Sequence, residues 1–143
     1  MADDEVLKAF EAGVEPPGGF HHAQHVRVAW CYLCRYRVPE ALERFRAGLR
    51  RFADAQGSPE RYHETITTAY VLLIDERLRV QGRELAWNVF ASSNADLLSW
   101  NPSILDRYYR TATLRSDLAR HTFVPPDEDE APVGTAWRAV IAP

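Results

Sequence analysis

Three histidines give this sequence its clearest chemical signal. His22 and His25 are three residues apart in an apolar segment that is expected to be helical, so both lie on one helical face. His63 lies in the first turns of another predicted helix, on a face that continues through Thr67 and Tyr70. Both faces are expected to point inward, where neutral imidazoles that leave one coordination position open suit zinc, copper, iron or nickel. The sequence therefore predicts a mononuclear transition-metal site with His22, His25 and His63 as ligands.

A metal-free interpretation of the same histidines stays open. Buried histidines often do no more than form hydrogen bonds with a carbonyl or a carboxylate group. The spacing His22-x-x-His25 is a weaker helical chelate than His-Glu-x-x-His, which the chain lacks. Glu60-x-x-His63 has the spacing found in di-iron carboxylate bundles, but the required second copy does not occur. The alternative prediction is a polar network of histidines that lines a pocket or satisfies the core.

The segment from Tyr62 to Thr67 is where function is expected to concentrate. It places five hydrogen-bonding side chains in six positions of a helix that must also bury apolar surface. Such a conflict between local polarity and burial is typical of functional sites. Glu64 and Tyr109 are the candidate catalytic residues, as groups that transfer a proton or support the metal ligands. Four side chains are candidates for substrate binding, namely Tyr62, Thr67, Trp30 and Arg120.

Other familiar catalytic motifs are missing or badly placed. Cys31 and Cys34 form a Cys-x-x-Cys pair deep within a predicted helix, whereas redox sites place this pair at the start of a helix. We therefore interpret both cysteines as small core residues. The chain contains no Gly-x-Gly-x-x-Gly loop, no phosphate-binding Gly-Lys-Ser/Thr loop and no Gly-x-Ser-x-Gly elbow.

The composition narrows the classes of protein to which the chain can belong. Its 143 residues, 46% of them hydrophobic, are enough for one domain with a single core. The net charge of −3 offers no basic excess for nucleic acid, and apolar stretches such as Ala69–Ile74 are too short to span a bilayer. Two cysteines and an acidic N-terminus without signal-peptide features indicate a cytoplasmic protein.

Apolar residues recur at helical spacing along most of the chain, and no stretch shows the alternation of a β-strand. The expected helices cover residues 3–12, 20–34, 39–56, 59–79, 85–92, 102–109 and 114–121. We therefore predict an all-α fold, a compact single-domain bundle of four to six helices formed by residues 1–123. Residues 124–143 are acidic and rich in proline, which predicts a poorly ordered tail or an extended strap.

Several of these motifs together resemble a family of small, uncharacterised bacterial helical proteins. The matching residues are His22-x-x-His25-x-x-x-Ala29-Trp30-x-Tyr32-Leu33, Tyr62-His63-Glu64-Thr65-Ile66-Thr67, Tyr108-Tyr109, Ser116-Asp117-x-Ala119-Arg120-x-x-Phe123 and Pro126-Asp127. The resemblance covers residues 20–127 and implies no catalytic residue, because no established activity comes with the family. It does favour the grouping of His22, His25 and His63.

The leading prediction from these observations is a small cytosolic metal-dependent enzyme that acts on a small organic substrate. Its open metal position would bind oxygen or activate water. The main alternative is a non-catalytic helical domain with a histidine-lined pocket, which binds a ligand or another protein. A third interpretation is a metal-free acid–base enzyme in which His63 and Glu64 act together. The expected partner is a small molecule rather than nucleic acid or a membrane, and a homodimer is an open alternative to a monomer.

Overall fold

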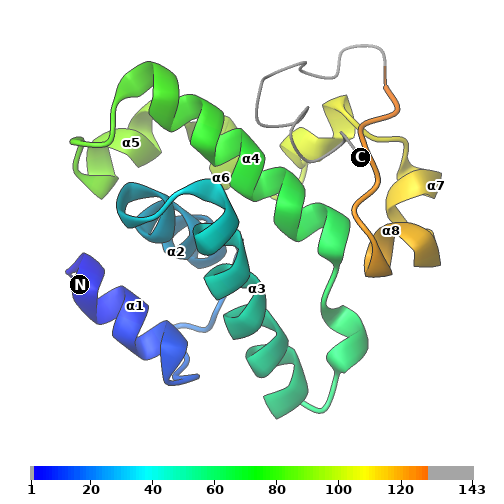
Figure 1. Cartoon of the computed structure of the whole chain (residues 1–143), viewed down its shortest axis with the longest axis horizontal. Coiled ribbons are helices and arrows are strands. Elements are labelled where there is room, and N and C mark those ends of the chain that lie inside the picture. Colours follow the sequence, from blue (N-terminus) through cyan, green and yellow to red (C-terminus); the bar gives the residue numbers. More distant parts are fainter. Residues whose placement is uncertain (1, 129–143) are drawn as a thin grey trace.

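Helices joined by short loops make up residues 2–128, which the computed structural model describes (Figure 1). The longer helices are α1 (Asp3–Glu11), α2 (His22–Arg35), α3 (Val38–Ala55), α4 (Glu64–Gln81) and α5 (Trp87–Ser93). The shorter elements are α6 (Ala95–Leu98), α7 (Thr111–Leu114), α8 (Asp117–His121) and the 3-10 turns η1 (Pro59–Arg61) and η2 (Ile104–Arg107). These residues contain no strand, so the prediction of an all-α bundle is confirmed. Within the same range, no helix combines the length and the apolar character that crossing a bilayer requires.

The core is built around α2 and α4. Every residue of α4 from Thr67 to Asp75 is buried, and α2 is buried continuously from Val28 to Leu33. Helix α3 packs against both of them, and α1 packs against α2. A helix that is buried around its whole circumference has no face that points to water. The polar groups of α4 must therefore find their partners within the protein.

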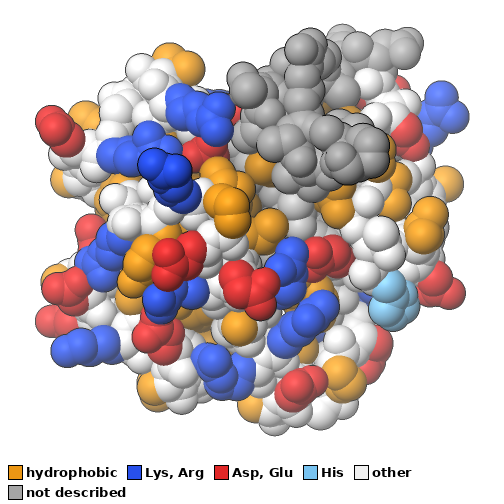
Figure 2. All heavy atoms as spheres, in the orientation of Figure 1, with side chains coloured by type: hydrophobic (Ala, Val, Ile, Leu, Met, Phe, Trp, Pro, Cys, Tyr) orange, Lys and Arg blue, Asp and Glu red, His pale blue; other side chains and the backbone are white. Residues whose placement is uncertain are grey.

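Helix α3 is amphipathic, as its residue spacing predicts. Its buried side facing the core consists of Ala41, Phe45, Gly48 and Ala53. On its outer side, Arg44 pairs with Glu40 and Arg46 pairs with Glu43. Figure 2 shows acidic and basic side chains interleaved across the face of the molecule that it presents. Exposed ion pairs contribute only about 0–1 kcal/mol each, so apolar burial is what fixes the position of α3.

The predicted helix at 59–79 is divided in two in the structure. Residues Pro59–Arg61 form a single 3-10 turn, and α4 begins only at Glu64. His63 is the residue that precedes α4, and its Nδ1 accepts a hydrogen bond from the backbone N–H of Ile66 at 3.1 Å. Because His63 has extended backbone angles and caps the helix with its side chain, it cannot belong to a continuous helix.

The two helices predicted after residue 100 are also shorter than expected. In the first, at 102–109, the bond before Pro102 is cis and only the turn η2 is helical. The second, at 114–121, is replaced by α7 and α8. Helix α8 begins after Ser116, whose hydroxyl oxygen accepts a hydrogen bond from the N–H of Ala119 at 3.1 Å. The polar residues of this part of the chain favour local caps over long helices.

Residues 124–128 lie as an extended strap against the helices. The hydroxyl of Tyr109 donates a hydrogen bond to the carbonyl oxygen of Val124 at 2.6 Å. The N–H of Val124 in turn donates to the side-chain oxygen of Thr65 at 3.0 Å, at the start of α4. The first part of the predicted acidic tail is therefore bound to the helical domain. The rest of that tail, 129–143, lies outside the described residues.

Close packing between α1 and α3 makes Gly48 a test of the core. A Cβ atom added at Gly48 would lie 2.0 Å from a ring atom of Phe10. Alanine normally stabilises a helix over glycine by roughly 0.5–1 kcal/mol, but overpacking a core costs about 1–3 kcal/mol. We expect Gly48→Ala to lower the free energy of unfolding by about 1 kcal/mol or more, measured by urea denaturation. The exposed neighbour Ala47, changed to Ser, should have a far smaller effect; equal effects would contradict the packing.

Candidate functional site

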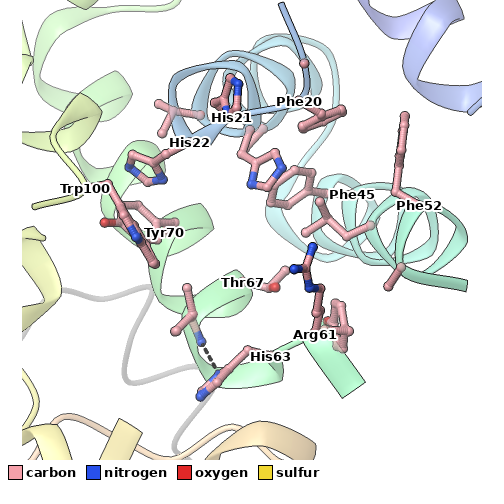
Figure 3. Close-up of a pocket in the computed structure, with 18 of the residues that line it drawn as sticks. Phe20, His21, His22, Phe45, Phe52, Arg61, His63, Thr67, Tyr70 and Trp100 are labelled. Atoms are coloured by element: carbon pink, nitrogen blue, oxygen red, sulfur yellow. Dashed lines mark hydrogen bonds between the residues drawn. The ribbon is translucent and has the colours of Figure 1, made fainter. Parts of the chain in front are cut away.

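A cavity of about 640 Å³ lies between α2, α3 and α4. Its apolar walls come from three helices and from the loop before α2, and consist of Phe20, Val26, Ala29, Phe45, Leu49, Phe52, Ala53, Ile66 and Ile74. Its polar lining consists of Glu15, His21, His22, His25, Gln56, Arg61, Tyr62, His63, Thr67, Tyr70 and Trp100. Figure 3 shows α2 on one side of this space and the start of α4 on the other. Four of the five histidines of the chain therefore line one cavity.

His22, in the first turn of α2, is held by one hydrogen bond and two aromatic contacts. Its Nε2 lies 2.8 Å from the carbonyl oxygen of Leu97. A carbonyl oxygen only accepts, so Nε2 carries the proton and Nδ1 is left as an acceptor. The ring centroid of His22 lies 4.8 Å from that of Tyr70 and 5.0 Å from that of Trp100. Burial lowers the pKa of His22, which favours the neutral imidazole.

The imidazole of His25, one helical turn further along α2, forms no hydrogen bond with any described residue. Its ring centroid lies 4.3 Å from that of Phe20. Burial, reinforced by the nearby His22 and His21, lowers the pKa of His25 to about 4. At neutral pH this side chain is therefore an uncharged imidazole that offers the cavity one donor and one acceptor.

Both ring nitrogens of His63 are engaged by the backbone. Nδ1 accepts from the N–H of Ile66, and Nε2 donates to the carbonyl oxygen of Leu114 at 2.6 Å. Burial lowers the pKa of His63. Protonation of Nδ1 would also remove the acceptor that binds the N–H of Ile66. The imidazole thus joins the start of α4 to the end of α7.

The three predicted metal ligands line the same cavity, but they do not converge. Figure 3 shows His63 on the opposite side of the space from His22. Among residues 2–128, no group of three His, Cys, Asp or Glu side chains lies close enough together to hold a metal ion. Coordination by His63 would also break one of its two backbone hydrogen bonds. The structure therefore gathers His22, His25 and His63 around one space without forming a ligand cluster.

Tyr62 and Thr67, two of the four predicted substrate-binding residues, line the cavity. The guanidinium of Arg50 lies 4.7 Å from the ring centroid of Tyr62, on the outer surface of α3. The hydroxyl of Tyr62 donates to Glu64, and burial together with this bond raises the pKa of Tyr62. Thr67 is buried one turn into α4. Tyr62 is thus held by a hydrogen bond and a cation–π contact, and Thr67 by its burial in α4.

Glu64, the predicted proton-transfer residue, does not line the cavity. The guanidinium of Arg46 donates two hydrogen bonds to its carboxylate, at 2.9 Å and 2.7 Å. The hydroxyl of Tyr62 donates to the same carboxylate. This paired carboxylate joins α3 to α4 and is not directed at a ligand, so the expected catalytic role of Glu64 has no geometric support. The acid–base pair of His63 and Glu64 loses its support for the same reason.

The remaining three predicted site residues lie elsewhere. Trp30 is buried and packs against aromatic side chains of α5. Tyr109 is buried, and its hydroxyl is used by the strap, at the carbonyl oxygen of Val124. Arg120 donates to the carbonyl oxygen of Glu60 and lines a separate surface hollow. These three side chains hold the fold together at places that the cavity does not reach.

Arg61 and the apolar side of α3 are part of the cavity, and sequence reasoning did not assign them there. The sequence pattern does not separate the α3 residues Phe45, Leu49 and Phe52 from core residues, because a helical stripe is the same whether it meets another helix or a cavity. Arg61 immediately precedes the Tyr62–Thr67 segment, and that adjacency was the available signal.

Comparison of the chain with protein-family models, with curated proteins and with solved structures found no match in any of the three. The site must therefore be interpreted from its own geometry.

The lowered pKa of His25 predicts a specific pH dependence of stability. An unfolded histidine takes up a proton as the pH falls below about 6.5, whereas folded His25 resists protonation until about pH 4. The folded state thus binds fewer protons in this window, and the contribution of His25 to stability is present above pH 6.5 and lost toward pH 4. At roughly 1.4 kcal/mol per pH unit, the total loss is about 3 kcal/mol.

Urea denaturation of the wild type and of His25→Gln at several pH values isolates this contribution. All other groups titrate in both proteins, so the difference between the two free energies of unfolding reports on His25 alone. As the pH falls from 6.5 toward 4, the free energy of unfolding of the wild type should fall more steeply than that of the variant. A difference that does not change with pH would mean that His25 is readily protonated in the folded state.

Proposed function

We propose that this protein binds a small organic molecule in the histidine-lined cavity, with His25 as the principal hydrogen-bonding group. The observation that carries this proposal is the state of His25: a neutral imidazole, next to apolar walls, with no hydrogen bond to any described residue. His25 is partly buried, and a ligand in the cavity can supply the hydrogen-bond partner that no described side chain provides.

The dimensions and lining of the cavity support the same proposal. Sites for small molecules commonly enclose about 300–1,000 Å³ and combine apolar walls with a few placed polar groups. This cavity has 640 Å³, a wall of phenylalanine and aliphatic side chains, and polar groups of which His22, Tyr62 and His63 are already held by hydrogen bonds. A preformed site of this kind loses little conformational entropy on binding.

Histidine NMR tests whether the cavity is the binding site. We expect small aromatic and aliphatic compounds to shift the imidazole resonances of His25 and His22 in protein labelled with 15N-histidine. His121 is exposed on α8, outside the cavity, and is the internal reference. His25→Leu removes the donor and the acceptor of the imidazole and should weaken binding by roughly 2- to 10-fold, which corresponds to a net contribution of about 0.5–1.5 kcal/mol.

Two outcomes would count against the proposed function. Equal shifts at His121 and His25 would indicate weak binding to the surface. No shift at His25 across a broad compound library would remove the support for a small-molecule site.

A metal-dependent enzyme is the second candidate, because His22, His25 and His63 all line one cavity. His25 has both ring nitrogens available, and His22 keeps Nδ1. For His63 to join them, it would have to exchange its hydrogen bond with Leu114 for a metal bond. A bound zinc, copper, iron or nickel ion would then provide Lewis-acid or redox chemistry toward a small substrate.

Elemental analysis with a His63→Asn variant tests this second candidate. Asparagine can still accept the hydrogen bond from the N–H of Ile66, so we expect α4 to stay capped and the fold to be kept. If the three-histidine site exists, protein purified without chelator carries a near-stoichiometric transition metal, and the variant loses it. Full metal occupancy in the folded variant would reject His63 as a ligand.

A further inference from the structure

Arg61 introduces a positive charge into the histidine-lined cavity. It is the last residue of the turn η1, and Figure 3 shows its side chain reaching into the cavity toward Thr67. Its guanidinium forms no hydrogen bond or ion pair with any described residue. Arginines nearby behave differently: Arg46 is paired with Glu64, and Arg120 donates to a carbonyl oxygen.

The other groups that line the cavity do not neutralise Arg61. His22, His25 and His63 have lowered pKa values and carry no charge at neutral pH. Glu15 also lines the cavity, from the exposed loop between α1 and α2, but it forms no ion pair with Arg61. Arg61 is exposed to solvent, and its unpaired guanidinium is open to an anion that enters the cavity.

We propose that the ligand of this cavity is an organic anion, a monocarboxylate with an apolar body, and that Arg61 binds its carboxylate. This inference rests on the proposed small-molecule function of the cavity. A guanidinium presents two parallel N–H donors that match the two oxygens of a carboxylate. The body of the ligand then lies along the phenylalanine wall, where His25 can reach a polar substituent.

The number of positive charges favours a monocarboxylate over a phosphate ester. Arg61 is the only Lys or Arg among the described residues that line the cavity. A phosphate carries nearly two negative charges at neutral pH and is usually bound by several cations or backbone N–H groups. One guanidinium above apolar walls balances one carboxylate.

Calorimetric titration with matched compounds tests the proposal. The probes are benzoate, 2-naphthoate, indole-3-acetate and decanoate, each compared with its primary amide and with the primary amine of the same skeleton. We expect the best acid to bind about two- to fivefold more tightly than its amide, because the guanidinium favours the charged group while the exposure of Arg61 to solvent limits the gain. The preference should diminish at high salt, since part of it is electrostatic.

Two variants assign the preference to Arg61. Arg61→Gln should bind acid and amide alike, and Arg61→Lys should retain part of the preference, because it keeps the charge without the planar fork. The matched control is Arg115→Gln: Arg115 is an exposed arginine at the end of α7 that does not line the cavity, so this variant should behave as the wild type. Urea denaturation of each variant verifies that the fold is kept.

The outcomes separate this inference from the proposed function. If amides bind as tightly as acids, or if Arg61→Gln keeps the preference for acids, the anion proposal is wrong and the small-molecule site stands. Tighter binding of the amines, abolished by Glu15→Gln, would assign the opposite charge to the ligand and also overturn the proposal. If no compound of the panel binds, both the inference and the proposed small-molecule function fail.

Discussion

The first turn of α4 is the constraint on which the rest of the structure depends. This helix is buried around its circumference, so its first N–H groups and its polar side chains cannot rely on water. His63 caps the N–H of Ile66, and Arg46 of α3 pairs with Glu64. The hydroxyl of Thr65 donates to the carbonyl oxygen of Thr122 and accepts from the N–H of Val124, where the strap begins. Each buried group left unpaired would cost about 1–3 kcal/mol. One helical turn thereby fixes α3, α7 and the strap relative to the core.

The same constraint produces the cavity. Because His63 is fixed at the start of α4, the residues Thr67, Tyr70 and Ile74 follow it along one side of the helix and form one wall. The opposite wall belongs to α2 and α3, where the small side chain of Ala29 leaves space. Protein interiors are otherwise closely packed, with few voids larger than a water molecule. A space of 640 Å³ beside the first turn of α4 is far larger than such voids and lies within the size range of small-molecule sites.

The sequence predicts those parts of the architecture that depend on residues close to one another along the chain. The helical stripes and the inward face shared by His63, Thr67 and Tyr70 follow from local spacing, and that face does line the cavity. The predicted helix start at residue 59 was wrong. The ring of His63 caps α4 at Glu64, and that ring is held by the carbonyl oxygen of Leu114, 51 residues away. The partner of Glu64, 18 residues earlier on α3, was equally beyond the reach of a local pattern. Non-local contacts decide which polar residue is structural.

Those contacts also reduce the set of residues that are free to act on a ligand. The segment from Tyr62 to Thr67 looked functional because it is polar where the helix should be apolar, yet its hydrogen-bonding groups mostly serve the start of α4. The cavity side chains that are not used in this way include the neutral imidazole of His25 and the guanidinium of Arg61. A group that the fold does not need can be changed without unfolding the protein. At neutral pH, the effects of substituting His25 or Arg61 should therefore appear mainly in binding, whereas those of substituting His63 combine binding with folding.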